Sequence, residues 1–150
     1  MKKFEFQLQR LLSYKGQLLD GELMTLAILN NLLEKEQIKR LKLVTEQIKC
    51  RASFEKEMKE NTTPATCQVY AHYSRNIKDQ IKECENEIQI ISDQVEEQLN
   101  VVKKLKLEEK SLEKIKESRL DDYNKEDRKK AELHIEEFIA TTQIMGEASS

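Results

Sequence analysis

Residues 81–112 read IKECENEIQIISDQVEEQLNVVKKLKLEEKSL, and this stretch decides the fold. Two rows of residues recur in it every seven positions, offset by three: Ile81, Ile88, Val95 and Val102 in the first, and Cys84, Ile91, Gln98, Leu105 and Leu112 in the second. A repeat of this period with β-branched residues in the first row is typical of a coiled-coil seam. The stretch therefore predicts a long helix that packs along one side against another helix. Glu109 and Lys116 fall on the same seam, which predicts a change of packing after about residue 108.

Residues 60–66, ENTTPAT, contain the single proline of the chain and predict its one clear break. Thr63 can cap free amide groups at a helix start, and Pro64 fits the first helical turn, where a missing N–H does no harm. Asn61 can terminate the preceding helix, whose last turn carries Lys56 and Lys59. We therefore expect one helix over about residues 3–60, a turn at about 61–63, a second helix over about 64–143, and a frayed tail over 144–150.

The apolar pattern before the break is less regular. A row spaced by eleven residues consists of Leu8, Leu19, Asn30, Leu41 and Ala52, flanked by Leu12, Leu23, Leu26, Leu33, Val44 and Ile48. An eleven-residue repeat gives little supercoiling, so it predicts a nearly straight helix pair. Between Leu18 and Leu33 the apolar residues occupy more than one face of the predicted helix. One neighbouring helix covers a single stripe, so the surplus indicates a further partner or loosely packed extra leucines.

Two long helices joined by a short turn can bury their seams by folding back on each other. We therefore predict an all-α fold: a long antiparallel two-helix coiled-coil hairpin, organised as a single unit over residues 1–150. With the turn near residue 63, Phe4 lies opposite Tyr123, and the longer second helix overhangs the first beyond that point. The overhang contains apolar residues that have no predicted intrachain partner: Leu133, Ile135, Phe138, Ile139 and Ile144. Unpaired apolar groups on a projecting helix mark a binding surface, although a fraying helix end is the alternative.

The composition argues against catalysis and against cofactors. Charged residues make up 36% of the 150 residues and aromatic residues 5%, with no Trp and three Gly, which is the composition of long helices. Such a chain buries a seam instead of a central core, so a catalytic pocket is not expected. No Gly-rich phosphate loop is present. Cys50, Cys67 and Cys84 lie 17 residues apart, unlike the close spacing of metal ligands, and are expected to be reduced thiols.

The charge pattern and hydropathy exclude two further classes. Residues 1–61 carry twelve Lys or Arg and nine Asp or Glu, and residues 62–150 carry fourteen and nineteen, so no general basic surface for nucleic acid exists. The most apolar stretch, residues 18–33, is interrupted by polar and acidic residues and predicts no membrane span. We therefore expect a cytoplasmic protein that binds other proteins.

Both ends of the chain resemble the flagellar export protein family FliJ. The N-terminal resemblance lies in residues 4–15, FEFQLQRLLSYK. The C-terminal one lies in residues 112–117, LEKIKE, then Tyr123, Arg128 and residues 135–138, IEEF. The resemblance implies an antiparallel coiled coil, similar to the central stalk of rotary ATPases, that serves flagellar type III secretion. It implies binding to the export ATPase ring, promotion of ring assembly and activity, and links to an export-gate membrane protein and substrate chaperones. It places the protein at the cytoplasmic face of the inner membrane, held there through other proteins.

The resemblance also gives a role to residues near the turn. Members of this family engage the export gate through hydrophobic and aromatic positions in this general region, which here holds Tyr70, Tyr73 and Ile77. The alternative is that these residues close the hairpin as core. With the overhang residues Leu133, Ile135, Phe138 and Ile139, they form the predicted partner-binding set. An injectisome relative would show nearly the same pattern, and a structural spacer or self-assembling scaffold is the alternative function.

Overall fold

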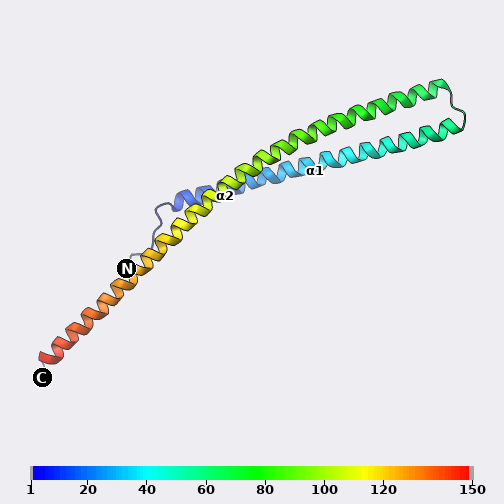
Figure 1. Ribbon diagram of the computed structural model, residues 1–150. Helices are drawn as coiled ribbons and strands as arrows, with labels where there is room; N and C mark the ends of the chain where they lie inside the picture. Colours follow the sequence, from blue (N-terminus) through cyan, green and yellow to red (C-terminus); the bar gives the residue numbers. More distant parts are fainter. Residues whose placement is uncertain (1, 149–150) are drawn as a thin grey trace. The chain divides into compact units, whose positions relative to one another are not determined.

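The protein consists of two long helices. The structure, a computed structural model, describes residues 2–148 of the chain, with side chains to residue 147 (Figure 1). Helix α1 spans Gln9–Lys59 and helix α2 spans Pro64–Ala148, and residues 2–148 include no strand. The all-α class and the longer second helix are confirmed. By their internal packing, the described residues divide into two units: one holds residues 19–103, and the other holds residues 2–18 with 104–148.

The first unit is an antiparallel helix hairpin, with the turn at one end (Figure 1). On the α2 side the seam contains Ile77, Cys84, Ile91 and Val102, which are all buried. Their spacing follows the seven-residue repeat, because a helix that supercoils about a partner returns the same face to it every two turns. The predicted seam of α2 is therefore confirmed over this unit.

On α1 the seam also follows a seven-residue repeat, so the eleven-residue row was wrong. Leu41, which belongs to that row, and Ile48, which flanks it, are each 65% exposed. Asn30 and Ala52, two further members of the row, are exposed as well. The half-buried positions of α1 in this unit are Leu19, Glu22, Leu26, Leu29, Leu33, Glu36, Leu43, Val44, Gln47, Cys50, Phe54 and Glu57. The physical reason is that two helices sharing one seam must have the same period, and α2 repeats every seven residues.

Polar contacts cross this seam at intervals. The Gln98 side-chain amide donates to the backbone oxygen of Glu22 at 2.9 Å and to the Glu22 carboxylate. The Cys84 thiol donates to the backbone oxygen and to the carboxylate of Glu36, both at 3.3 Å. Burial raises the pKa of Cys84, and the hydrogen bond to Glu36 raises it further, so the group stays a neutral thiol. Polar pairs within a coiled-coil seam specify the register, because a slip would leave them without partners.

The turn forms as its sequence predicts. The hydroxyl oxygen of Thr63 accepts from the Thr66 backbone N–H at 3.3 Å, and its backbone oxygen accepts from the Cys67 N–H at 3.2 Å. Thr63 is thus the N-cap of α2, with Pro64 in the first turn. Asn61 has a φ of 66°, the left-handed conformation that ends many helices and that Asn tolerates better than most residues.

In the second unit the N-terminal segment packs on α2 as a non-helical chain. We expected a helix from about residue 3, but α1 begins at Gln9. Phe4 lies against Tyr123, with ring centroids 5.6 Å apart, as the hairpin register predicted. Phe6 is buried, and the Arg119 guanidinium lies 5.6 Å from its ring centroid. Residues two apart lie on nearly opposite sides of a helix but on the same side of an extended chain, so only a non-helical segment lets both rings face α2.

Among the described residues of the same unit, one ion pair joins α1 and α2. The Lys15 Nζ donates to a carboxylate oxygen of Glu108 at 2.6 Å, and this hydrogen bond lowers the pKa of Glu108. Lys116 in turn donates to the side-chain oxygen of Gln9 at 2.8 Å. After about residue 108, polar pairs therefore join the apolar contacts of Phe4 and Phe6, in agreement with the predicted change of packing at Glu109 and Lys116.

Candidate partner-binding surfaces

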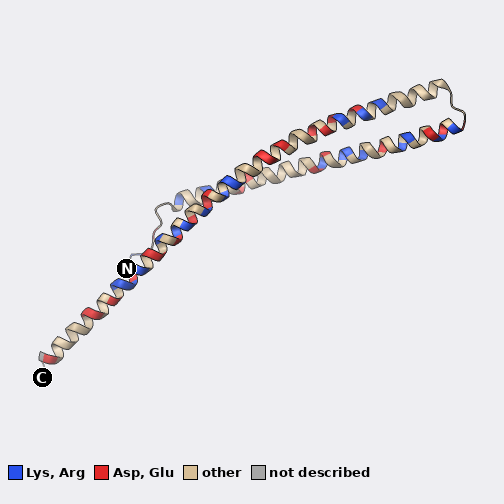
Figure 2. Cartoon of the chain, in the orientation of Figure 1, with Lys and Arg blue, Asp and Glu red and all other residues tan. Residues whose placement is uncertain are grey.

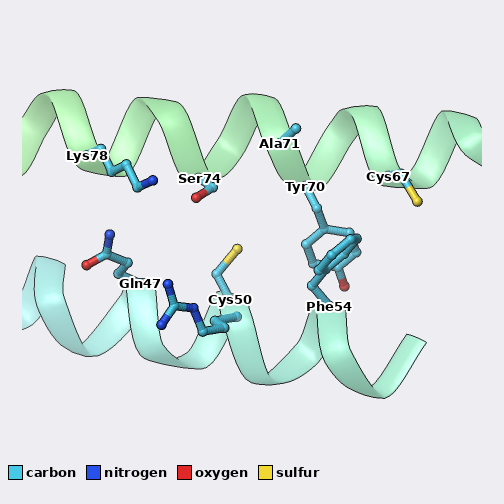
Figure 3. A pocket seen from close by; sticks show the side chains of 9 residues that line it. Gln47, Cys50, Phe54, Cys67, Tyr70, Ala71, Ser74 and Lys78 are labelled. Carbon is cyan, nitrogen blue, oxygen red and sulfur yellow. The ribbon is translucent and has the colours of Figure 1, made fainter. Parts of the chain in front are cut away.

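The predicted residues near the turn have three different environments. Tyr70 faces α1, and its ring packs on Phe54 with centroids 5.3 Å apart (Figure 3). Burial raises the pKa of the Tyr70 phenol, and a hydrogen bond to Glu57 raises it further. Ile77 is only 2% exposed and belongs to the seam, and its role in partner binding stays a prediction. Tyr73 is 48% exposed. Tyr73 is therefore the residue of the three that presents a large surface to a partner.

A cavity of about 210 Å³ lies between the helices beside the Tyr70–Phe54 pair. Its lining includes the small side chains of Cys50, Ala71 and Ser74, and Figure 3 shows Cys50 and Ser74 extending into the space between the helices. The cysteines Cys50 and Cys67 are free, and the ring pair stands between them in Figure 3. Among the described residues, no group of three or more His, Cys, Asp or Glu could hold a metal ion. The cavity is thus a gap in the packing of the seam.

The predicted overhang is a continuous exposed helix. Every described side chain from Arg128 to Glu147 is exposed. The helix continues to Ala148, where we expected fraying from residue 144; residues 149 and 150 lie outside the described part. The hydroxyls of Thr141 and Thr142 donate to the backbone oxygens of Glu137 and Phe138, four residues earlier, as helical geometry allows.

Apolar residues occupy two opposite faces of this overhang. Ile135, Phe138 and Ile139 are 59%, 73% and 50% exposed, and their spacing of three and four places them on one face. Leu133 and Ile144 are 57% and 67% exposed, and at 100° per residue they lie on roughly the opposite side. Residues 138–145, FIATTQIM, contain no charged residue, and the end of α2 is largely tan in Figure 2. A partner that contacts one side of this helix would leave the other apolar face in water.

A third exposed surface was missed from the sequence. It consists of Ile38, Leu41, Thr45, Ile48 and Ala52, all exposed on α1, and we call it the outer stripe. Leu41, Ile48 and Ala52 appeared in the sequence as part of the presumed eleven-residue seam. A row of lysines at seven-residue intervals, beginning at Lys35, was the signal that could have identified this stripe as a separate surface.

These features define a class: a protein of two long helices, each of which carries an exposed apolar surface. None of the described helices has an apolar stretch sufficient to cross a membrane. The model of the family described as the flagellar FliJ protein matches residues 4–147, so the chain belongs to the FliJ family. It is accordingly a component of the flagellar export apparatus. No curated protein and no solved structure matches the chain.

Proposed function

We propose that this chain is a stalk of the flagellar export ATPase. The overhanging part of α2 enters the centre of the ATPase ring, promotes ring assembly and increases ATP hydrolysis. The protein works in the cytoplasm, at the cytoplasmic face of the inner membrane, where it also links the ATPase to the export gate and to substrate chaperones.

The observation that carries this proposal is the pair of opposite apolar faces on the overhang. Ile135, Phe138 and Ile139 need a partner on one side, and Leu133 and Ile144 need one on the other. A ring pore surrounds a helix and can bury both faces at once, whereas a groove buries one. Arg128, Lys129 and Lys130 precede these faces by one to two turns and supply charges that can orient the helix in the pore.

A titration with the purified export ATPase tests the proposal against its alternative. A stalk occupies the ring centre, so stimulation of ATP hydrolysis should saturate at one chain per ring. The measurement is ATPase rate against the ratio of chain to ring, with the mass of the complex determined by analytical ultracentrifugation. A structural spacer or self-assembling scaffold would instead form larger assemblies by itself and would leave the ATPase rate unchanged. Either of these outcomes would exclude the stalk.

In the region near the turn, we propose that Tyr73 binds the export-gate protein. Tyr73→Ala should weaken binding to the export-gate protein, because it removes an exposed aromatic side chain of a type that is frequent at interface hot spots. A loss of more than about 1 kcal/mol, roughly fivefold in affinity, is expected by surface plasmon resonance. Val69→Ala is the matched control, since Val69 is a 68% exposed apolar residue one turn earlier. Unchanged binding by the Tyr73 variant would show that the export-gate protein does not bind this surface.

A further inference from the structure

The outer stripe has the spacing of a second coiled-coil seam on α1. Ile38, Thr45 and Ala52 are seven residues apart, and Leu41 and Ile48 form a second row offset by three. The three large side chains of the stripe are well exposed: Ile38 is 46%, Leu41 65% and Ile48 65% exposed. This two-row pattern is the one that lets a helix receive a partner helix by knobs-into-holes packing. Because α2 covers the other face of α1, the stripe has room for a third helix.

One edge of the stripe is lined by lysines with the same period. Lys35, Lys42, Lys49 and Lys56 recur every seven residues, each one position after the row that holds Leu41 and Ile48. All four are exposed, and no ion pair within residues 2–147 involves any of them. In coiled-coil terms they occupy a flanking position, where charges select the partner. Figure 2 shows basic residues recurring along the part of α1 that leads to the turn.

The charge around the stripe is basic overall. Residues 35–51 contain six Lys or Arg and two Glu, a net charge of +4. One of the two acids, Glu36, is half-buried in the seam, where it accepts the Cys84 thiol hydrogen bond. The stripe and its edge thus present an apolar strip beside an unpaired row of positive charge.

We propose that the outer stripe of α1 binds an acidic amphipathic helix of another protein. The apolar side of that helix packs on Ile38, Leu41 and Ile48, and a row of Asp or Glu along its edge pairs with Lys35, Lys42, Lys49 and Lys56. This site is separate from the overhang of α2, so it does not depend on the proposed role in the ATPase ring.

The same charges disfavour a second copy of the chain as the occupant. In an antiparallel pairing of two outer stripes, equivalent flanking rows meet, so lysine would face lysine. In a parallel pairing the lysine row meets the row of Gln37, Val44 and Arg51, which contains no acid. Like charges at flanking positions destabilise a coiled coil, whereas opposite charges give both attraction and partner choice.

Two designed peptides test the site directly on the full chain. Each has four heptads with Ile and Leu at the core positions; the acidic peptide carries Glu at both flanking positions and the basic peptide carries Lys. By fluorescence anisotropy the acidic peptide should bind at least about tenfold more tightly than the basic one, and its affinity should fall at high salt. Replacing all four lysines with Glu should reverse this preference. The double change Leu41→Ser with Ile48→Ser should weaken binding of the acidic peptide at least about tenfold. The helicity of the chain, measured by circular dichroism, should stay unchanged.

A matched variant separates this site from general charge attraction. Changing Lys103, Lys104, Lys106 and Lys110 to Glu alters the net charge equally on exposed positions of α2, and should leave binding of the acidic peptide within about twofold. Equal affinity for both peptides, or equal loss in the two lysine variants, would overturn the proposal. So would a dimer of the chain in ultracentrifugation that Leu41→Ser with Ile48→Ser abolishes, because the stripe would then bind a second copy.

Discussion

Ile135→Asp combined with Phe138→Asp is expected to abolish stimulation of the export ATPase while leaving the melting temperature nearly unchanged. The two side chains are 59% and 73% exposed, so the isolated chain loses almost no buried surface when they change. Burial of each in a partner would contribute about 1.5 to 3 kcal/mol before the costs of association. Placing two carboxylates in that apolar contact adds a desolvation penalty, so binding should weaken by well over about tenfold.

The opposite face of the overhang gives a sharper version of this experiment. Leu133→Asp with Ile144→Asp should have the same effect if the partner encloses the helix, whereas a groove would respond to one pair of changes only. Ile90→Asp with Leu107→Asp is the matched control, because these residues are 51% and 67% exposed on α2 outside the overhang. The measurements are ATPase rate, ring assembly by ultracentrifugation, and thermal melting by circular dichroism. Full stimulation of ATP hydrolysis by both overhang variants would contradict the stalk assignment. The region near the turn would then be the next candidate for the contact with the ATPase.

The second helix could be predicted from its sequence because its seam residues follow a single seven-residue repeat. From Ile81 to Leu105 the apolar rows keep their seven-residue period and their offset, and polar residues fill most other positions. The turn was equally predictable, since Thr63 and Pro64 act through local hydrogen bonds that need no tertiary information.

The first helix was harder because it has two apolar faces. Leu19, Leu26 and Leu33 belong to the seam with α2, whereas Leu41 and Ile48 belong to the outer stripe. Residues drawn from both faces produce a spacing of eleven that neither face has. The seam positions of α1 also include Glu22 and Glu36, which sequence patterns place on the solvent side but which are satisfied here by Gln98 and Cys84. Only the partner helix reveals which face is covered.

The N-terminal segment and the region near the turn show a second limit of prediction from the sequence. A helix from residue 3 is a reasonable expectation from composition, yet Phe4 and Phe6 pack on α2 through a non-helical segment. Local propensity for a helix was outweighed by tertiary contacts of the two aromatic rings with Tyr123 and Arg119. Near the turn, the aromatic and apolar composition alone could not separate the exposed Tyr73 from the buried Ile77.

Ile77→Ala is therefore expected to act on stability. Ile77 is 2% exposed within the seam, and shortening a buried Ile to Ala removes packing and leaves a cavity that costs about 2 to 5 kcal/mol. The free energy of unfolding, measured by urea denaturation and circular dichroism, should fall by an amount within that range.

Ile48→Ala provides the comparison, because it makes the same chemical change at a side chain that is 65% exposed. A surface substitution of this kind should alter the free energy of unfolding by no more than about 0.5 kcal/mol. Equal losses in the two variants would mean that the seam does not run through Ile77, and the pairing of α1 with α2 would need a different register. Full stability of Ile77→Ala combined with loss of gate binding would restore Ile77 to the partner surface, since a side chain that contributes to binding and not to folding has to be accessible.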